Sequence, residues 1–112
     1  MVAASDWLAL DLFKAAPQVG LKIPQDLSIV GYDDIEISAM TDPALTTVRV
    51  EKELLGRLAV RRLLHHIERE TRRSNRAQPQ YPGSRRAEPA IYITVPVSLV
   101  ERQSCRAISK RP

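Results

Sequence analysis

The sequence predicts an α/β fold in which parallel strands are flanked by helices. Two stretches, 6–16 and 51–68, carry apolar residues at every third or fourth position, as amphipathic helices do. Short runs rich in β-branched residues at 27–32, 45–50 and 91–100 are typical of strands. The run at 27–32 is apolar enough for a strand that is buried on both faces, which favours a parallel sheet.

The first helix is expected to begin at Ser5 or Asp6, because either side chain can cap a helix N-terminus. Pro17 and Gly20 should end it. Its apolar face is predicted to consist of Leu8, Leu12 and Ala15, together with Trp7. A helix followed by a buried strand indicates a βαβ unit, whose first strand would be the stub 1–4.

The second helix carries a wider apolar stripe that is predicted to be buried and consists of Leu54, Leu55, Leu58, Ala59, Leu63 and Ile67. Gly56 lies inside this helix, where glycine is less favourable than alanine by about 1 kcal/mol. It is therefore expected to permit the close approach of a neighbouring element. Glu53 and Arg57 have the spacing of a helical ion pair.

The chain after this helix is less regular. Residues 71–89 are rich in arginine and proline and are predicted to form a flexible loop. The strand at 91–100 should be interrupted or lie at an edge, because Pro96 has no backbone N–H to donate. Residues 101–112 are polar and basic and are predicted to form a tail.

Composition excludes several classes of protein. The 112 residues suffice for one modest domain, and the single cysteine, Cys105, excludes an internal disulfide and a multi-cysteine zinc site. No export signal and no apolar stretch of about 20 residues is visible, so we expect a cytoplasmic chain outside the membrane. Lys and Arg number 17 against 13 Asp and Glu, and most of the basic residues lie in the second half. A basic nucleic-acid-binding module in 57–86 is therefore one alternative function.

Few residues have the pattern of a reactive site. The four glycines are too far apart for a phosphate loop, and His65 and His66 are adjacent on a helix, so they cannot chelate one metal from one face. Asp33 and Asp34 directly follow the strand at 27–32, at the edge where open α/β sheets bind ligands. Three interpretations of this pair stay open: ligand recognition by Asp33, a magnesium-binding acid pair of a receiver-like signalling domain, and turn capping.

Several segments together resemble the C-terminal third of the lactose-repressor/galactose-repressor (LacI/GalR) family of bacterial transcription regulators. In order, they are SDWLA (5–9), IPQDLSIVGYDD (23–34), PALTTV (43–48), LGRLA (55–59), LL (63–64) and PVSLVERQSC (96–105). Each motif is short, but their order and spacing cover nearly the whole chain.

The resemblance implies a partial, Rossmann-like lobe of a periplasmic-binding-protein-like fold, with a small effector between two lobes. Residues 1–106 would form the partial effector-binding and dimerisation domain. Within it, 1–47 and about 91–106 would belong to the C-terminal lobe, whereas the helix at about 50–70 would belong to the N-terminal lobe. Residues 107–112 would be a tail.

The resemblance also assigns site residues. Asp33 would contact the effector, and Ser5 stands where the family commonly has an effector-binding asparagine. Val50 occupies a position that is polar in some sugar-binding members, which argues against a β-galactoside. The dimer interface would include Leu10, Lys14, Met40 and Thr41.

From this resemblance we expect a non-enzymatic effector-binding domain for a sugar or nucleoside-like molecule, in a homodimer or higher oligomer. No metal and no cofactor is expected. The family's DNA-binding headpiece has no counterpart in this sequence, so operator DNA would be bound only through a headpiece outside it, and the chain is expected to be a truncated form.

Overall fold

The computed structural model describes residues 1–75 and 91–107, apart from the side chains of residues 73 and 74. The chain divides into two compact units, one made of Met1–Val50 with Pro96–Pro112 and the other of Glu51–Val95. The chain therefore leaves the first unit once, after Val50, and returns to it once, at Pro96.

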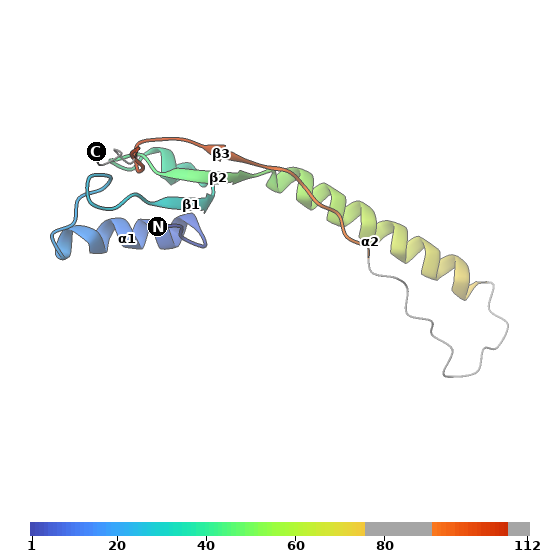
Figure 1. Cartoon of the computed structure of the whole chain (residues 1–112). Helices are drawn as coiled ribbons and strands as arrows, with labels where there is room; N and C mark the ends of the chain where they lie inside the picture. Colours follow the sequence, from blue (N-terminus) through green and yellow to red (C-terminus); the bar gives the residue numbers. More distant parts are fainter. Residues whose placement is uncertain (76–90, 108–112) are drawn as a thin grey trace. The chain divides into compact units, whose positions relative to one another are not determined.

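The first unit contains a three-stranded sheet in the order β1-β2-β3 (Figure 1). Strand β1 (Val30–Asp33) pairs in parallel with β2 (Thr46–Val50), and β2 pairs in antiparallel fashion with β3 (Val97–Val100). Val2 forms an isolated parallel bridge with Val30, which places the predicted N-terminal stub beside β1. The α/β prediction is confirmed, although β3 is antiparallel and begins only after Pro96.

Helix α1 (Asp6–Gln18) begins where the sequence predicts and ends two residues later. Ser5 is its N-cap, and its hydroxyl accepts a hydrogen bond from the backbone N–H of Leu8 at 3.3 Å. Pro17 lies inside the last turn, and the chain leaves the helix through Gly20, whose φ of 78° suits glycine.

The predicted apolar face of α1 is wrong in part. Leu12 is half-buried, but Trp7, Leu8 and Ala15 are exposed. The face turned toward the rest of the unit instead carries Asp6, Ala9, Leu10, Phe13 and Ala16. The displacement has a physical reason: Asp6 is completely buried, so the helix is rotated to turn a carboxylate inward.

The core of the first unit is small. Ala3, Ala9, Ile29 and Leu45 form its buried centre, and four partly buried side chains pack against them, namely Leu12, Phe13, Ile23 and Leu27. Small residues at positions 3 and 9 allow α1 to lie close to the sheet, as Figure 1 shows.

Residues 101–106 are part of the fold, which corrects the prediction that the tail begins at 101. Ser104 is fully buried, and its hydroxyl donates to the carbonyl of Ile29 at 2.6 Å while accepting from the N–H of Thr46 at 2.8 Å. The half-buried thiol of Cys105 also donates to the Ile29 carbonyl, at 3.2 Å. This segment therefore joins the strands at their N-terminal ends.

The second unit consists mainly of helix α2 (Lys52–Ser74), which is longer than predicted and includes the first residues assigned to the loop. The rest of that predicted loop, 76–89, lies outside the described residues, as do the last five residues of the tail. Within the described part of the chain, no helix is long and apolar enough to span a membrane.

The apolar stripe of α2 is exposed, contrary to the prediction. Leu55, Leu63 and Ile67 are each about half exposed, and only Leu54, Leu58 and Arg62 are partly buried among the helix residues whose burial is described. A Cβ on Gly56 would meet nothing within 4 Å. An amphipathic pattern fixes which side of a helix is apolar, but burial needs a second element, and the described chain supplies none over this face.

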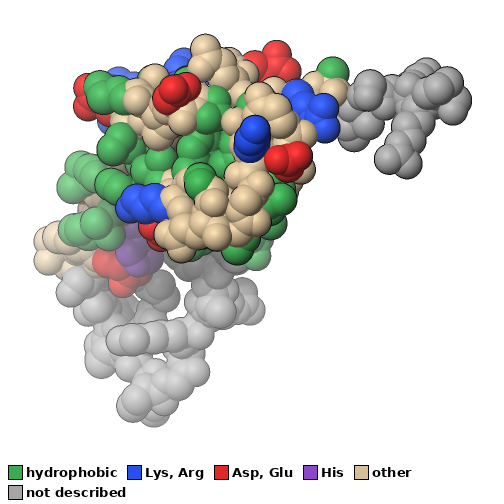
Figure 2. All heavy atoms as spheres, turned by 90° about the vertical axis from the view of Figure 1, so that its left-hand side faces the viewer, with side chains coloured by type: hydrophobic (Ala, Val, Ile, Leu, Met, Phe, Trp, Pro, Cys, Tyr) green, Lys and Arg blue, Asp and Glu red, His purple; other side chains and the backbone are tan. Residues whose placement is uncertain are grey.

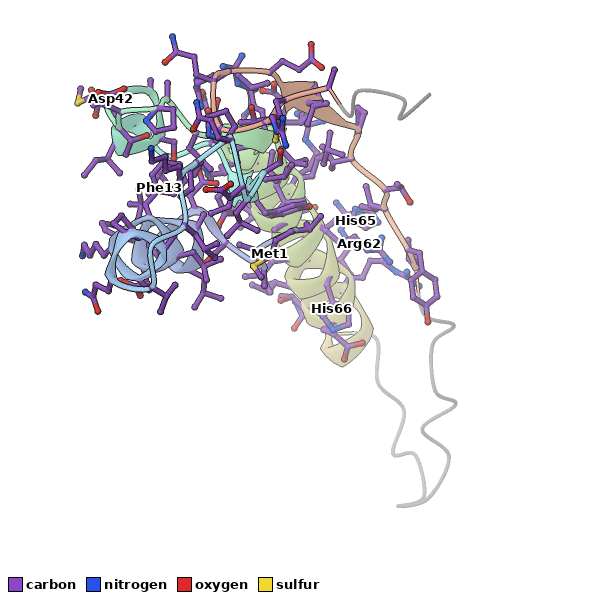
Figure 3. The ribbon with its side chains drawn as sticks, turned by 60° about the vertical axis from the view of Figure 1, so that its left-hand side comes forward. Met1, Phe13, Asp42, Arg62, His65 and His66 are labelled. Atoms are coloured by element: carbon purple, nitrogen blue, oxygen red, sulfur yellow. The ribbon has the colours of Figure 1, made fainter. Side chains whose placement is uncertain are left out.

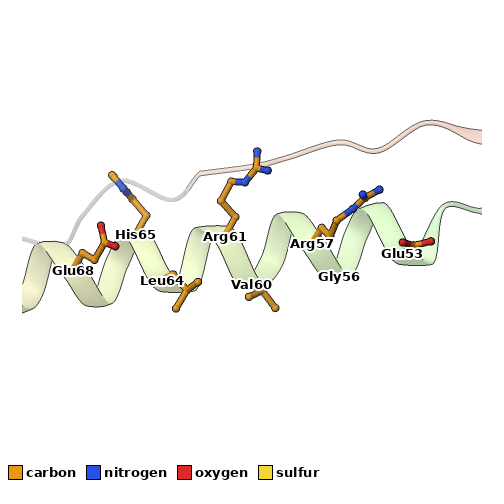
Figure 4. A pocket seen from close by; sticks show the side chains of 8 residues that line it. All are labelled: Glu53, Gly56, Arg57, Val60, Arg61, Leu64, His65 and Glu68. Atoms are coloured by element: carbon orange, nitrogen blue, oxygen red, sulfur yellow. The ribbon is translucent and has the colours of Figure 1, made fainter.

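Figure 4 shows the resulting open groove, of about 790 Å³. Val60 and Leu64 project from one side of α2, whereas Arg61 and His65 project from the other. Glu53 and Arg57 also line the groove, but their side chains do not form the predicted ion pair in the described structure.

Replacing Ser104 by alanine should lower the free energy of unfolding by about 2 kcal/mol, because it leaves the buried Thr46 N–H without a side-chain acceptor and the Ile29 carbonyl with only the weak Cys105 thiol as a side-chain donor. Ser28→Ala is the matched control, since the Ser28 hydroxyl accepts one exposed hydrogen bond, from the N–H of Arg106. Urea denaturation of the whole chain measures both, and equal losses would contradict the structural role given to Ser104.

Candidate functional site

The carboxylate of Asp6 organises the C-terminal edge of the parallel strands. It is completely buried and accepts three hydrogen bonds from three separate segments. Oδ2 accepts from the N–H of Ile35 at 2.9 Å and from the hydroxyl of Ser38 at 2.6 Å, and Oδ1 accepts from the hydroxyl of Thr47 at 2.5 Å. A buried charge is tolerated only with such partners, and the first turn of α1 also favours an anion.

Gly31 in β1 makes room for this carboxylate. A Cβ at position 31 would overlap Oδ1 of Asp6 and press against the side chain of Leu45. Glycine is therefore required here by close packing and not by its own backbone angles, because Gly31 has no positive φ.

Asp33, the last residue of β1, and Asp34, which follows it, have unusual backbone angles. The φ angle is 110° at Asp33 and 49° at Asp34, a left-handed region that residues with a Cβ seldom adopt. Such angles persist only where neighbouring contacts hold them. Here the N–H of Asp34 donates to the hydroxyl of Thr47 at 3.4 Å, and Asp6 holds the N–H of Ile35.

Two arginines hold the Asp34 side chain. Arg102 Nη2 donates to Oδ1 and Arg49 Nε to Oδ2, both at 2.6 Å, and the Asp34 side chain is only 9% exposed. Burial alone would raise the pKa of Asp34, but the hydrogen bonds from Arg102 and Arg49, and then their charges, outweigh it and hold the pKa below its ordinary value.

Asp33 and Ser5 lie at the same edge of the sheet. Val2 and Val30 are parallel partners, and Ser5 and Asp33 each follow their partner residue by three positions. Both residues are half-buried. The structure thus brings together the two residues predicted to bind an effector, although Ser5 also caps α1.

The four residues predicted for a dimer interface differ in exposure. Lys14 and Met40 are well exposed, with Lys14 paired to Asp11 at 3.7 Å, and Thr41 donates a hydrogen bond to the carbonyl of Ser38. Leu10 is only 8% exposed within the chain itself.

Both oxygens of Asp34 are paired with arginines, whose positive charges disfavour a magnesium ion between Asp33 and Asp34. Among the residues that the structure describes, no group of three or more His, Cys, Asp and Glu side chains could hold a metal ion. His65 and His66 are both exposed and leave α2 in different directions (Figure 3).

A separate groove of about 480 Å³ lies near the C-terminal end of α1. Phe13 and Asp42, labelled in Figure 3, line it together with residues of the loop that precedes β1. It is formed by segments that precede the strands, whereas Asp33 is the last residue of β1.

The most important residues that the sequence prediction missed are Asp6 and Arg102. The residue pattern predicts Asp6 only as a helix cap and places Arg102 in a polar tail, although the family motif at 96–105 contains Arg102. A signal for Asp6 exists in the glycine at position 31 of an otherwise β-branched strand, because a strand glycine often marks a close approach. Nothing local distinguishes Arg102 from the other arginines.

The model of the periplasmic binding protein-like domain matches residues 1–105. The chain belongs to this family. The LacI-family transcriptional regulators carry the domain in the form seen here, so the family predicted from the sequence motifs is confirmed.

Three relatives illustrate the similarity. The regulator MalR of Streptomyces coelicolor is 51% identical over 67 residues, which are 60% of this chain and 20% of MalR. A lac repressor dimer bound to operator and the anti-inducer ONPF matches 96% of this chain and 32% of its own, with 33% identity and a TM-score of 0.69. A LacI family regulator from Enterococcus faecalis with bound ribose matches 93% and 33%, with 29% identity and a TM-score of 0.71.

The chain spans about a fifth of the length of the curated relative and about a third of each solved chain. These members of the family are transcriptional regulators, not enzymes, as the sequence predicts.

Replacing Gly31 by alanine should lower the free energy of unfolding by about 3 kcal/mol, because the new Cβ displaces the buried Asp6 carboxylate from its donors. Gly20→Ala is the control. A Cβ at position 20 would meet open space, but the φ of 78° there is unfavourable for alanine, so this variant should lose about 1 kcal/mol of unfolding free energy. Urea denaturation compares them, and a loss at position 31 no larger than at position 20 would refute the packing explanation.

Asp34→Asn should destabilise the chain by about 2 kcal/mol at pH 7, because it removes the negative charge that pairs with Arg49 and Arg102. Because the pKa of Asp34 is lowered by folding, its contribution is complete above about pH 4, the unfolded pKa, and is lost as the pH falls through the lower folded pKa. The variant should therefore lose less stability between pH 5 and pH 2 than the wild type, measured by urea denaturation at each pH. Asp11→Asn, at an exposed pair, should leave the pH dependence nearly unchanged.

Proposed function

We propose that this chain forms one wall of a sugar-binding effector site of a LacI-type regulator, with Asp33 as its main polar contact. The observation that carries the proposal is the clamped turn at the C-terminal edge of β1, which fixes the backbone of Asp33 where open α/β sheets bind ligands. A carboxylate accepts hydrogen bonds from two hydroxyl groups at once, and neighbouring hydroxyl groups are the common feature of sugars.

Ser5 is the second proposed contact. Its hydroxyl is short and caps α1, but it can still donate its proton while it accepts the N–H of Leu8. Val50, at the end of β2, offers only an apolar side chain, so a ligand there would meet a hydrocarbon surface. A small sugar or a nucleoside-like molecule suits this combination better than a β-galactoside.

We also propose that the first unit contributes to a homodimer. Lys14, Met40 and Thr41 remain the proposed contacts, and Leu10 would support them from beneath because it is buried within the chain. Figure 2 shows hydrophobic side chains at the surface on the side that faces left in Figure 1. The relative bound to operator is a dimer, which supports this assignment.

In the complete regulator, effector binding would shift the balance between conformations of the dimer, and a headpiece outside this sequence would bind operator DNA in the cytoplasm. The helix α2 would belong to the second lobe. The basic nucleic-acid module lacks a specific observation in its favour, because the arginines of α2 accompany an exposed apolar face.

The sugar site is tested by titrating ribose into the ¹⁵N-labelled whole chain and following the amide signals of residues 5, 33 and 34. Ribose is chosen because a relative holds it. We expect these signals to shift with a dissociation constant in the millimolar range, on the order of 4 kcal/mol of binding free energy, as suits one wall of a cleft.

Asp33→Asn should abolish these shifts, and Asp42→Asn, at the separate groove near α1, should preserve them. Binding that survives in Asp33→Asn would overturn the assignment of Asp33. A wild-type chain that binds neither ribose nor a disaccharide such as cellobiose would overturn the sugar site itself.

A further inference from the structure

Arg102 is the most extensively bonded arginine near the Asp33 turn. Its guanidinium donates from Nη2 to Oδ1 of Asp34 at 2.6 Å and from Nη1 to the carbonyl of Leu45 at 2.7 Å. Its backbone N–H donates to the hydroxyl of Thr46 at 2.9 Å. The side chain is only 17% exposed, so the planar guanidinium is held between the start of β2 and the turn after β1.

Arg49 restrains Asp34 less strongly than Arg102 does. Arg49 gives Asp34 one hydrogen bond, from a side chain that is 50% exposed. Water competes with Asp34 for the exposed side chain of Arg49. Arg102 is mostly buried and donates one hydrogen bond to the Asp34 carboxylate and one to the Leu45 carbonyl. Arg102 is thus the stronger of the two restraints on Asp34.

Asp34, which the arginines restrain, lies in a turn with unusual backbone angles. Asp33, with a φ of 110°, would leave the left-handed region if Asp34 were released, because that region costs a residue with a Cβ about 1–3 kcal/mol. Asp6 accepts the N–H of Ile35, and within the described part of the chain it is the two arginines that bind the Asp34 carboxylate.

We infer that Arg102 is a positioning residue for the effector site: through Asp34 it fixes the backbone from which the Asp33 carboxylate meets the ligand. This inference rests on the proposed function of Asp33. Arg102 itself is not assigned a contact with the sugar, since its guanidinium is engaged by Asp34 and Leu45.

The test uses Arg102→Gln and Arg102→Lys in the whole ¹⁵N-labelled chain, with Arg106→Gln as the matched control. Arg106 is an exposed arginine of the same segment, and its backbone N–H donates to the Ser28 hydroxyl, a contact that the substitution keeps. Two quantities are measured for each variant: the affinity for ribose, and the three-bond HN–Hα couplings of Asp33 and Asp34, which report φ directly.

Arg102→Gln should weaken ribose binding by about tenfold or more and change the couplings of Asp33 and Asp34, while the amide signals of Ala9 and Ile29 in the core stay in place. Arg102→Lys keeps the charge without the fork and should recover part of both effects. Arg106→Gln should change neither. Unchanged couplings and affinity in a folded Arg102→Gln variant would overturn the inference.

The two measurements also separate this inference from the proposed function. If the wild type binds no sugar, the proposed function fails, and the couplings alone decide whether Arg102 holds the turn. If Arg102→Gln does not fold, Arg102→Lys decides: couplings and affinity equal to those of the wild type would show that the bidentate guanidinium does not position Asp33.

Discussion

A single buried carboxylate holds together the segments around the C-terminal end of β1. Asp6 is the first residue of α1, yet its side chain turns away from solvent and joins the helix to the turn after β1, to the short 3₁₀ helix at Glu36–Ala39 and to β2. Each of these segments supplies one N–H or O–H donor. Without these partners a buried charge would strongly oppose folding, so the carboxylate specifies how the segments meet rather than merely adding stability.

The Asp33–Asp34 turn is restrained from two directions. Asp6 accepts a hydrogen bond from the N–H of Ile35, and Arg49 and Arg102 bind the carboxylate of Asp34. The two consecutive left-handed residues are the consequence of these restraints. In the proposed sugar site, a carboxylate that is already held in place would lose little conformational entropy on binding, which would favour a small ligand with few contacts.

The sequence predicted the helices, the strands and the edge of the sheet that carries Asp33, because hydrophobic periodicity and turn residues are local signals. It failed where burial depended on distant partners. Asp6 looked like a solvent-exposed cap because its donors lie about 30 to 40 residues away in sequence. Arg102 looked like part of a basic tail for the same reason. The stripe on α2 was identified correctly as apolar, but its exposure depends on which element covers it.

The contact between Asp6 and Gly31 couples two positions that are 25 residues apart. Glycine is needed at 31 only as long as a carboxylate oxygen occupies the space that a methyl group would take. Among related sequences, a larger residue at the strand position should therefore occur only together with a shorter or uncharged residue at the start of the helix. The two sites are expected to change as a pair, and either change alone should be rare.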